Sequence, residues 1–435
     1  MQYYSTNGKA PRASLEKAVI RGLAEDRGLY MPERIPVLPE EFFDNIQTMT
    51  FHEIATTVAQ AFFGEDVPAA ELQRIVEETL SFDCPVVPVT RSIGALELFH
   101  GPTLAFKDVG ARFMARLLRY FTRNSDDERT IHVLVATSGD TGSAVANGFL
   151  GVEGVRVHVL YPKGKVSPIQ ECQFTTLGQN ITALEVDGNF DDCQALVKSA
   201  FMDAELTERL RLTSANSINV ARFLPQSFYY FNGYAQMKRL GLASQLVVCV
   251  PSGNFGNLCA ALFAKRMGLP VKRFVAANNA NEVFFDYLQT GRYEPRPSIP
   301  TLANAMDVGD PSNAARIFEL YGHDWKALTA DISGAVCSDE HIREALKYCR
   351  EKYGYQLDPH GACGFYAIYH RLAPGESALL CETAHPAKFK DTVEAATRSE
   401  IEIPARLAAF MQGEKQSVPM GRTYPEFKAY LSKLQ

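Results

Sequence analysis

The chain has 435 residues, long enough for two or three domains, and its 46% hydrophobic and 22% charged residues are typical of a globular protein with a large core. The formal net charge is −6 and the basic residues are scattered, so a nucleic-acid partner is not expected. No apolar run approaches the roughly 18 residues of a membrane span, and the first residues lack the apolar stretch of a secretory signal. We therefore expect a cytoplasmic protein without a membrane partner.

Residues 1–90 are expected to form a mainly helical N-terminal region. Apolar residues recur at helical spacing after Ser14, which predicts a first helix there. Thr50 and Glu53 have the spacing of a capping box before a second apolar-periodic segment. A third helix is expected at about residues 70–80. The interleaved prolines and valines that follow mark a boundary between this region and the rest of the chain.

A lysine with unusual neighbours comes next. Lys107 lies between Phe106 and a helix expected to begin nearby. The apolar face of that helix comprises Val109, Phe113, Leu117 and Phe121. Beside an apolar wall a lysine loses hydration, so its pKa falls and its amine becomes nucleophilic. Taken alone, Lys107 is better interpreted as an ordinary surface lysine at a helix start, and only the motifs around it favour a reactive amine.

Strands alternate with helices through the remainder of the chain. The expected strands are Ile131–Ala136, Val155–Tyr161, Gln245–Val250, Lys272–Ala277 and Ala378–Glu382. This alternation predicts right-handed βαβ units and parallel sheets covered by helices on both faces. We therefore expect an α/β fold with one parallel-sheet domain at residues 91–230 and a second at residues 231–435.

Polar loops follow three of these strands. The first is Thr137–Gly142, the second is Ser252–Asn257, and the third begins at Thr383. Glycines before a helix let the backbone approach a ligand, and the helix N-terminus offers free N–H groups to an anion. A tight strand-to-helix turn is the simpler interpretation of one such loop, but two matched copies favour anion binding. Because ligands bind at the carboxyl ends of parallel strands, the loops predict one crevice.

Other nucleotide and hydrolase motifs are absent. Neither glycine loop has the G-x-G-x-x-G spacing of a dinucleotide site or the Lys-Ser/Thr ending of a P-loop. The region Tyr161–Lys165, where an acidic ribose ligand would stand, is basic instead. No G-x-S-x-G elbow is present. The nine cysteines form no C-x-x-C pair and the nine histidines show no ligand spacing, so we expect reduced core thiols and no metal site.

The motifs together resemble one enzyme family. The segments LELFHGPTLAFKD, VATSGDTGSAVA, VPSGNFGNLCA and TAHPAKF resemble the signatures of threonine synthases, as do GLAEDRGLYMPERIP and SANSINVARFLPQ. The match covers nearly the whole chain in the expected order, and it is closest to the bacterial and fungal class with a long N-terminal region. The resemblance implies a fold type II enzyme, similar to the β-subunit of tryptophan synthase, with pyridoxal 5'-phosphate as cofactor.

The resemblance also implies a reaction. A threonine synthase is a lyase that converts O-phosphohomoserine and water to L-threonine and phosphate, by γ-elimination followed by β-addition of water. This is the last step of threonine biosynthesis. The family further suggests a monomer, with a dimer as the alternative. Other fold type II activities, such as a dehydratase, a sulfhydrylase or a phospho-lyase, remain alternatives, as does a binding protein that has lost turnover.

Roles for individual residues follow from the same resemblance. Lys107 falls where the family holds its cofactor as a Schiff base, and once freed it would act as the general base for the α-proton. Thr383 falls where a hydroxyl meets the pyridine nitrogen. Asp140 falls where many relatives have an asparagine near the phenolic oxygen, so its charge would alter that contact. The cofactor phosphate would be cradled by Gly253, Asn254, Phe255, Gly256 and Asn257.

Substrate contacts are expected from a separate group of residues. The resemblance assigns the substrate carboxylate and phosphate to Thr137, Ser138, Thr141, Asn216 and Arg222. We add Lys165 because it follows the second predicted strand. Arginine suits a bidentate grip on either anion, although a structural salt bridge is the more common role of a single arginine. His360 and His385 are acid–base candidates, for which a structural role is the more common interpretation.

Overall fold

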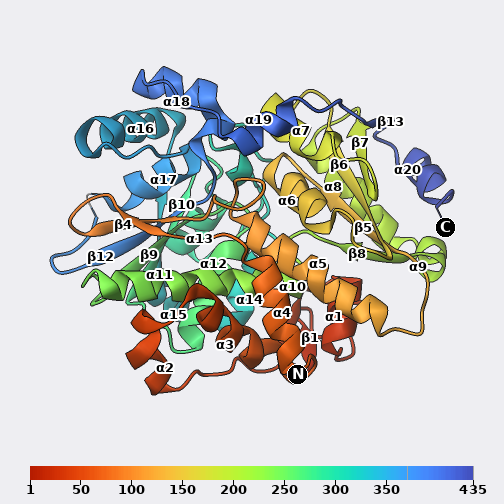
Figure 1. Ribbon diagram of the computed structural model, residues 1–435, viewed down its shortest axis with the longest axis horizontal. Coiled ribbons are helices and arrows are strands. Elements are labelled where there is room, and N and C mark those ends of the chain that lie inside the picture. The colour runs from red at the N-terminus through yellow and green to blue at the C-terminus, as the bar shows by residue number, and fades with distance from the viewer. Residues whose placement is uncertain (370, 435) are drawn as a thin grey trace. The chain divides into compact units, whose positions relative to one another are not determined.

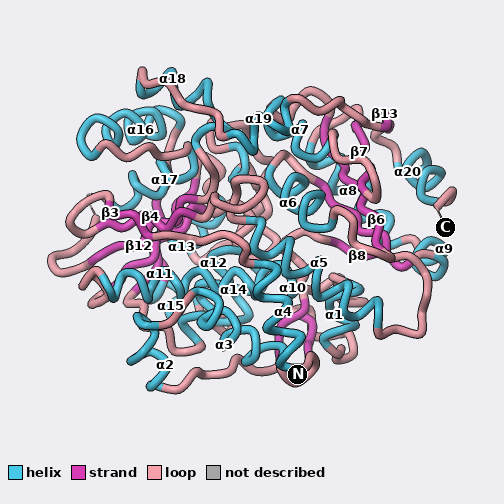
Figure 2. Tube along the Cα trace, in the orientation of Figure 1, coloured by secondary structure: helices cyan, strands magenta, loops and turns pink. Residues whose placement is uncertain are grey.

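The computed structural model describes residues 1–369 and 371–434, and they form two compact units (Figure 1). Unit 1 consists of Met1, residues 32–106 and residues 223–402. Unit 2 consists of residues 2–31, residues 107–222 and the segment from residue 403 onward. Each unit contains both strands and helices, which Figure 2 distinguishes by colour. None of the helices in the described residues has the length and apolar character needed to cross a bilayer.

These units differ from the three consecutive segments expected from the sequence, 1–90, 91–230 and 231–435. The N-terminal residues do not stand apart. Helix α1 (Leu15–Arg21) packs on β8 (Arg211–Ser214), and residues 2–31 belong with it to unit 2. Contacts made across the fold determine the units, and such contacts leave no local signal in the chain.

Unit 1 is built on a six-stranded sheet. Its order is β11 (Ile332–Val336), β10 (Arg273–Asn278), β9 (Leu246–Pro251), β12 (Ser377–Glu382), β4 (Ile93–Glu97) and β3 (Val86–Pro88). All neighbouring strands are parallel except β3, which runs antiparallel to β4 at the edge. The proline-rich stretch after residue 84 forms this edge strand, where a proline is tolerated.

Helices cover both faces of the unit 1 sheet. A Cβ placed on Gly233 of α11 (Ser227–Arg239) would touch Leu379, whereas one placed on Gly364 of α17 (Pro359–Ile368) would touch Leu380. Because successive residues of a strand point to opposite faces, α11 and α17 cover opposite faces of β12. The other helices of unit 1 are α2 (Glu40–Asn45), α3 (Phe51–Phe63), α4 (Ala69–Thr79), α12 (Gly256–Arg266), α13 (Val283–Thr290), α14 (Ala314–Leu320), α15 (Trp325–Asp331), α16 (Asp339–Tyr353) and α18 (Lys390–Thr397).

Unit 2 is built on a five-stranded, fully parallel sheet. Its order is β13 (Val418–Met420), β7 (Ile181–Val186), β6 (Val155–Pro162), β5 (Ile131–Ala136) and β8. Its helices besides α1 are α5 (Lys107–Arg123), α6 (Asp140–Phe149), α7 (Pro168–Thr175), α8 (Phe190–Met202), α9 (Ala204–Arg209), α19 (Ala405–Met411) and α20 (Tyr424–Leu431). The short helix α10 (Val220–Phe223) ends at the unit border, and the strands β1 (Tyr3–Ser5) and β2 (Tyr30–Pro32) pair near the N-terminus.

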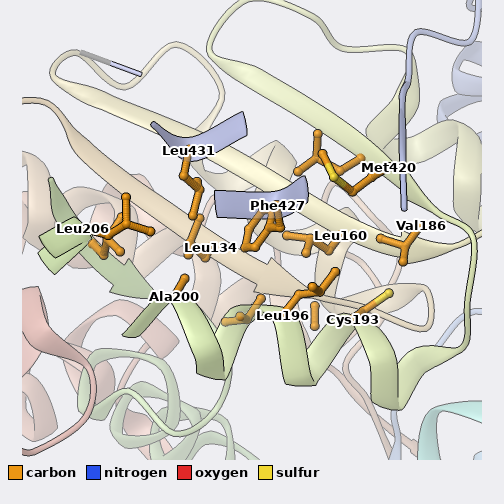
Figure 3. Close-up of a cluster of buried hydrophobic side chains, with 14 of the residues drawn as sticks. Leu134, Leu160, Val186, Cys193, Leu196, Ala200, Leu206, Met420, Phe427 and Leu431 are labelled. Carbon is orange, nitrogen blue, oxygen red and sulfur yellow. The ribbon is translucent and has the colours of Figure 1, made fainter. Parts of the chain in front are cut away.

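The C-terminal helix completes the core of unit 2. Figure 3 shows Phe427 and Leu431 of α20 directed toward Leu134 and Leu160 on the sheet. The α8 side chains in the same cluster are Cys193, Leu196, Val197 and Ala200, all buried. Residues from the segment 107–222 and from the C-terminal segment of this unit therefore bury one apolar surface together.

The predicted elements are largely present. Ser14 caps α1, with its side chain accepting from the Lys17 amide (3.2 Å). Thr50 and Glu53 form the capping box of α3. Each of the five predicted strands occurs with its ends displaced by at most one residue. All nine cysteines are free thiols and eight of them are buried, in keeping with their expected role as core residues.

A carboxylate organises the N-terminal segment of unit 2. Asp26 accepts hydrogen bonds from the Ser5 hydroxyl (2.6 Å) and from the amides of Gly28 (3.0 Å), Lys9 (2.8 Å) and Ala10 (2.8 Å). Partial burial opposes ionisation, but these four hydrogen bonds outweigh it and lower the pKa of Asp26 to about 2.

Replacing Asp26 with asparagine is expected to lower the free energy of unfolding at pH 7 by about 2 kcal/mol, because an amide cannot accept all four hydrogen bonds. Since the folded pKa is lowered, the stabilisation is present above the ordinary value of 3.8 and is lost as the pH falls toward 2. Urea unfolding of both proteins at pH 7 and pH 3 measures this, with D126N at an exposed site as control. An equal difference at both pH values would contradict the assignment.

Candidate active site

Polar loops follow the carboxyl ends of strands in both units. In unit 1 they follow β9 and β12, and in unit 2 they follow β5, β6 and β8. This is the edge of a parallel sheet at which ligands bind. The three loops singled out from the sequence therefore all lie at a sheet edge of the kind at which ligands bind.

The loop Ser252–Asn257 presents backbone amides at the start of α12. Phe255 adopts a left-handed conformation (φ 60°, ψ 14°) and its ring lies 4.3 Å from that of Phe284. Cys259 donates the first intrahelical hydrogen bond, to the Phe255 carbonyl (2.9 Å). The amides of Gly256 and Asn257 precede that bond, so they face outward at the positive end of the helix. This donor set suits a phosphate.

Side chains hold this loop in shape. The Asn257 carboxamide oxygen accepts from the Ser252 hydroxyl (2.7 Å) and the Leu258 amide (2.9 Å), and its nitrogen donates to the Pro251 carbonyl (2.9 Å). The Tyr230 hydroxyl donates to the Asn257 carbonyl (3.0 Å). The Asn257 side chain thus acts as a brace, which leaves its amide for a ligand.

Gly253 is fixed by close backbone packing. A Cβ at this position would lie 2.7 Å from Cα of Met306 and 2.8 Å from the carbonyl of Ala305, so only glycine fits. The segment that carries these two residues is held by Asp307, which accepts from the Thr301 hydroxyl (2.7 Å). Burial raises the pKa of Asp307 to about 6. This buttress was not identified from the sequence.

The segment before Lys107 pairs with the segment that carries Thr383. The Phe106 amide donates to the Thr383 carbonyl (2.9 Å), and the His385 amide donates to the Leu104 carbonyl (3.1 Å). Leu104 has a positive φ of 59°, a conformation that is uncommon for a non-glycine residue. Thr383 is buried, and Lys107, the residue after Phe106, is half-buried at the first position of α5.

Another lysine, Lys388, is buried and contacts the same pair of segments. Lys388 is 2% exposed, and its Nζ donates to the Thr103 carbonyl (2.9 Å). It was not selected from the sequence, although it lies in the TAHPAKF motif. Its position makes it the alternative amine against which any assignment of Lys107 has to be tested.

The two candidate histidines have structural hydrogen bonds. His385 accepts from the Ala387 amide through Nδ1 (3.1 Å), and burial lowers the pKa of His385 to about 4. His360 is paired with Asp358 through Nδ1 (2.5 Å) and accepts from the Ala305 amide through Nε2 (3.2 Å). Both ring nitrogens of His360 therefore make hydrogen bonds within the protein.

A fully buried carboxyl group lies next to Thr383 in the chain. Glu382 is fully buried, and its Oε2 accepts from the Asp358 amide (3.3 Å). Burial raises the pKa of Glu382 well above its usual range, and the nearby charge of Asp358 raises it further.

In unit 2, the loop Thr137–Gly142 is closed around one hydroxyl. Thr137 Oγ1 accepts from the amides of Gly139 (2.9 Å) and Gly142 (2.8 Å) and donates to the Gly139 carbonyl (3.1 Å). Asp140 is buried and its Oδ1 accepts from the Gln170 side chain (3.0 Å). Gly139 has φ 148°, and a Cβ there would meet Gln170 at 2.6 Å. The hydroxyl of Thr137 is fully used, whereas Ser138 and Thr141 are half-buried.

The remaining substrate candidates lie beyond β8 and β6. Arg222 is buried and donates through Nη1 to the Ala215 carbonyl. Burial lowers the pKa of Arg222 to about 10, and the charge of Asp108 opposes this shift. Asn216 is half-buried and donates to the Ala136 carbonyl (3.2 Å), which joins the ends of β8 and β5. Lys165 is exposed.

Together, the two parallel sheets, the phosphate-type loop and the amine-bearing segment define the class of fold type II pyridoxal-phosphate enzymes. The family model for pyridoxal-phosphate dependent enzymes matches residues 94–380. Models for the threonine synthase N terminus and C-terminal region match residues 2–80 and 361–430. The chain therefore belongs to the threonine synthase family.

Individual relatives agree with this assignment. A threonine synthase of Serratia marcescens is 42% identical over 431 residues, and the alignment covers 99% of both chains. The crystal structure of threonine synthase from Escherichia coli has a TM-score of 0.94 at 41% identity, covering 99% of each chain. The pyridoxal-phosphate-bound threonine synthase from Brucella melitensis has a TM-score of 0.91 at 35% identity, covering 99% of this chain and 98% of that one.

These findings confirm the expected fold class, cofactor and activity. The protein is a lyase that depends on pyridoxal phosphate and converts O-phosphohomoserine to threonine, the last step of threonine biosynthesis.

Proposed function

We propose that Lys107 is the amine that carries pyridoxal phosphate and moves the α-proton of O-phosphohomoserine. When bound, the cofactor supplies the electron sink for this proton loss. The pairing of Phe106 with Thr383 supports the proposal, because it ties the chain beside Lys107 to the strand end at which the ring nitrogen is expected. Lys107 is half-buried at the first position of α5, so its amine is less exposed to solvent than that of a surface lysine.

The second glycine loop would bind the cofactor phosphate. Gly253, Asn254, Phe255, Gly256 and Asn257 contribute backbone amides at the positive end of α12. Because a helix N-terminus favours a dianion over a neutral hydroxyl, this loop distinguishes the phosphorylated cofactor from its unphosphorylated form.

Thr383 and Asp140 would contact the cofactor ring. A threonine hydroxyl at the ring nitrogen stabilises a neutral pyridine better than a full positive charge, so it tempers the electron withdrawal. Asp140 is buried and accepts a hydrogen bond from Gln170, which limits its motion. Because the ring then withdraws electrons less strongly, the groups that bind the leaving phosphate would contribute more to the stabilisation of the transition state.

The substrate carboxylate and phosphate would be bound by unit 2. The residues we assign are Thr137, Ser138, Thr141, Lys165, Asn216 and Arg222. The geometry favours different roles within this set: Thr137 shapes its loop with its hydroxyl, whereas Ser138 and Thr141 lie at the start of α6, where an anion is favoured. Arg222 is buried and charged, which suits a bidentate grip on an anion.

Covalent trapping tests the central assignment. Reduction of the holoenzyme with borohydride, followed by peptide mass spectrometry, should fix the cofactor on Lys107, because only an amine joined to the cofactor aldehyde is trapped. Lys388 is the internal control, since it lies within the same pairing and is buried. Label on Lys388, or on neither lysine, would refute the assignment.

We further propose that the protein is a cytoplasmic monomer that acts without nucleic-acid or membrane partners. The scattered charges and the resemblance to the class with a long N-terminal region support this view. Sedimentation equilibrium of the purified holoenzyme decides the oligomeric state, and a concentration-independent dimer mass would overturn the monomer.

A further inference from the structure

Asn254, in the second glycine loop, is held by the segment that follows it in unit 1. Its carbonyl accepts from the Asn313 amide (3.3 Å) and from the Asn313 side-chain nitrogen (3.0 Å). Its side-chain oxygen accepts from the Ser312 amide (2.7 Å). Asn313 is fully buried, so the orientation of its carboxamide is fixed by its neighbours.

Arg316 sets that orientation. Its Nη1 donates to the Asn313 side-chain oxygen (2.7 Å). A guanidinium can only donate, so the carboxamide has to turn its oxygen to Arg316 and its nitrogen to the Asn254 carbonyl. Without this donor the carboxamide could flip and present an oxygen to the Asn254 carbonyl, which would repel the loop.

Arg316 also brings a buried charge to α12. Its side chain is fully buried, and the guanidinium lies 4.1 Å above the ring of Phe223, which in turn contacts Phe263 of α12 edge-on (5.2 Å). Burial lowers the pKa of Arg316 to about 10, so the group remains charged at neutral pH.

A bound dianion would stabilise a buried cation at this position, because charges interact more strongly inside a protein than in water. The positive end of α12 would add to the field of Arg316 at the same loop. The buried charge of Arg316 therefore favours a negative group in front of the loop.

We propose that Arg316 is a positioning residue for the cofactor phosphate, which orients the loop through Asn313 and places a positive charge behind it. This inference rests on the assignment of Gly253–Asn257 as the phosphate loop. It predicts that removal of Arg316 weakens recognition of the phosphate specifically and leaves recognition of the rest of the cofactor unchanged.

The test compares pyridoxal phosphate with pyridoxal, which lacks the phosphate. Apo forms of the wild type and of R316M are titrated with each compound, and dissociation constants come from the absorbance of the bound form. In R316M the preference for pyridoxal phosphate should fall by about tenfold, because a charge-assisted network is lost. The affinity for pyridoxal should change by less than about twofold.

Two further variants separate positioning from general destabilisation. N313A keeps the buried charge and removes the side-chain hydrogen bonds that join Arg316 to Asn254, so its preference should fall less than in R316M, by about threefold. R273M breaks the ion pair of Arg273 with Glu376 (2.6 Å) at the opposite end of the strands, so it should lower stability without changing the preference. Should R316M fail to fold, N313A decides the question.

The outcomes distinguish the two proposals. If the wild type itself binds both compounds equally, the assignment of the phosphate loop fails. If the wild type prefers pyridoxal phosphate and neither R316M nor N313A changes that preference, the role of Arg316 fails alone. Equal weakening of both compounds would likewise assign Arg316 a purely structural role and overturn the inference.

Discussion

Replacing Lys107 with alanine is expected to lower the rate of threonine formation by about 10³-fold or more, because the amine both attaches the cofactor and moves the substrate proton. The side chain is half-buried at the first position of α5, so its loss leaves the packed face of that helix intact. The rate is measured as phosphate release together with threonine formation, which also separates this reaction from a phospho-lyase that would yield 2-oxobutyrate.

The controls for this variant address charge and fold. K107R retains a positive charge but has no amine that can join an aldehyde, so it should be as inactive as K107A. K198A, at an exposed position of α8, should retain full activity. Circular dichroism and urea unfolding check that K107A remains folded. Activity of K107A within about tenfold of the wild type would refute the role assigned to Lys107.

The strands that were predicted are those with a local signature. Ile131–Ala136 and Val155–Tyr161 are β-branched runs bounded by turns, and both occur in the structure as β5 and β6. The strands β7 and β11 were not predicted, since ITALEV and ISGAV mix polar or glycine residues with apolar ones. They form strands because each pairs with an established neighbour, β6 and β10 respectively.

Two helices begin inside the glycine loops. Local propensity favours starts near Ala144 and Leu258, whereas α6 begins at Asp140 and α12 at Gly256. Glycines in the first turn lower the local helix propensity, so the local sequence predicts that the helix begins after them. Side chains elsewhere in the loop compensate: Thr137 accepts from the Gly142 amide. The difference matters because it brings the loop amides to the positive end of each helix.

Candidate site residues could be selected from the sequence where they belong to a family-specific motif. The residues that hold those motifs in place could not be selected in this way. Lys107, Thr383 and both glycine loops were selected from family-specific segments. Asn313, Arg316 and Asp307 were missed because their importance depends on contacts between segments that are distant in the chain. Asn313, for example, contacts a residue 59 positions earlier. Nothing in the local pattern around these residues distinguishes them from ordinary polar positions.

Replacing Gly361 with alanine is expected to lower the free energy of unfolding by about 3 kcal/mol or more, because the site has no room for a methyl group. A Cβ at Gly361 would overlap the Oε1 atom of Glu382, whose side chain is fully buried and has no solvent into which to move. Guanidinium unfolding of G361A measures the loss. Wild-type stability would show that the carboxyl group of Glu382 does not occupy this space.

The same contact predicts that a second substitution will restore stability. Glu382→Ala removes the carboxyl that the new methyl group meets, so G361A/E382A should be more stable than G361A alone, by about 1 kcal/mol or more. The single variant E382A should itself be destabilised by the cavity that it leaves. The two effects are then strongly non-additive, whereas additive losses would mean that the residues do not contact each other. Because Thr383 follows Glu382 directly, the absorbance of the bound cofactor should shift in G361A and return toward the wild type in the double variant.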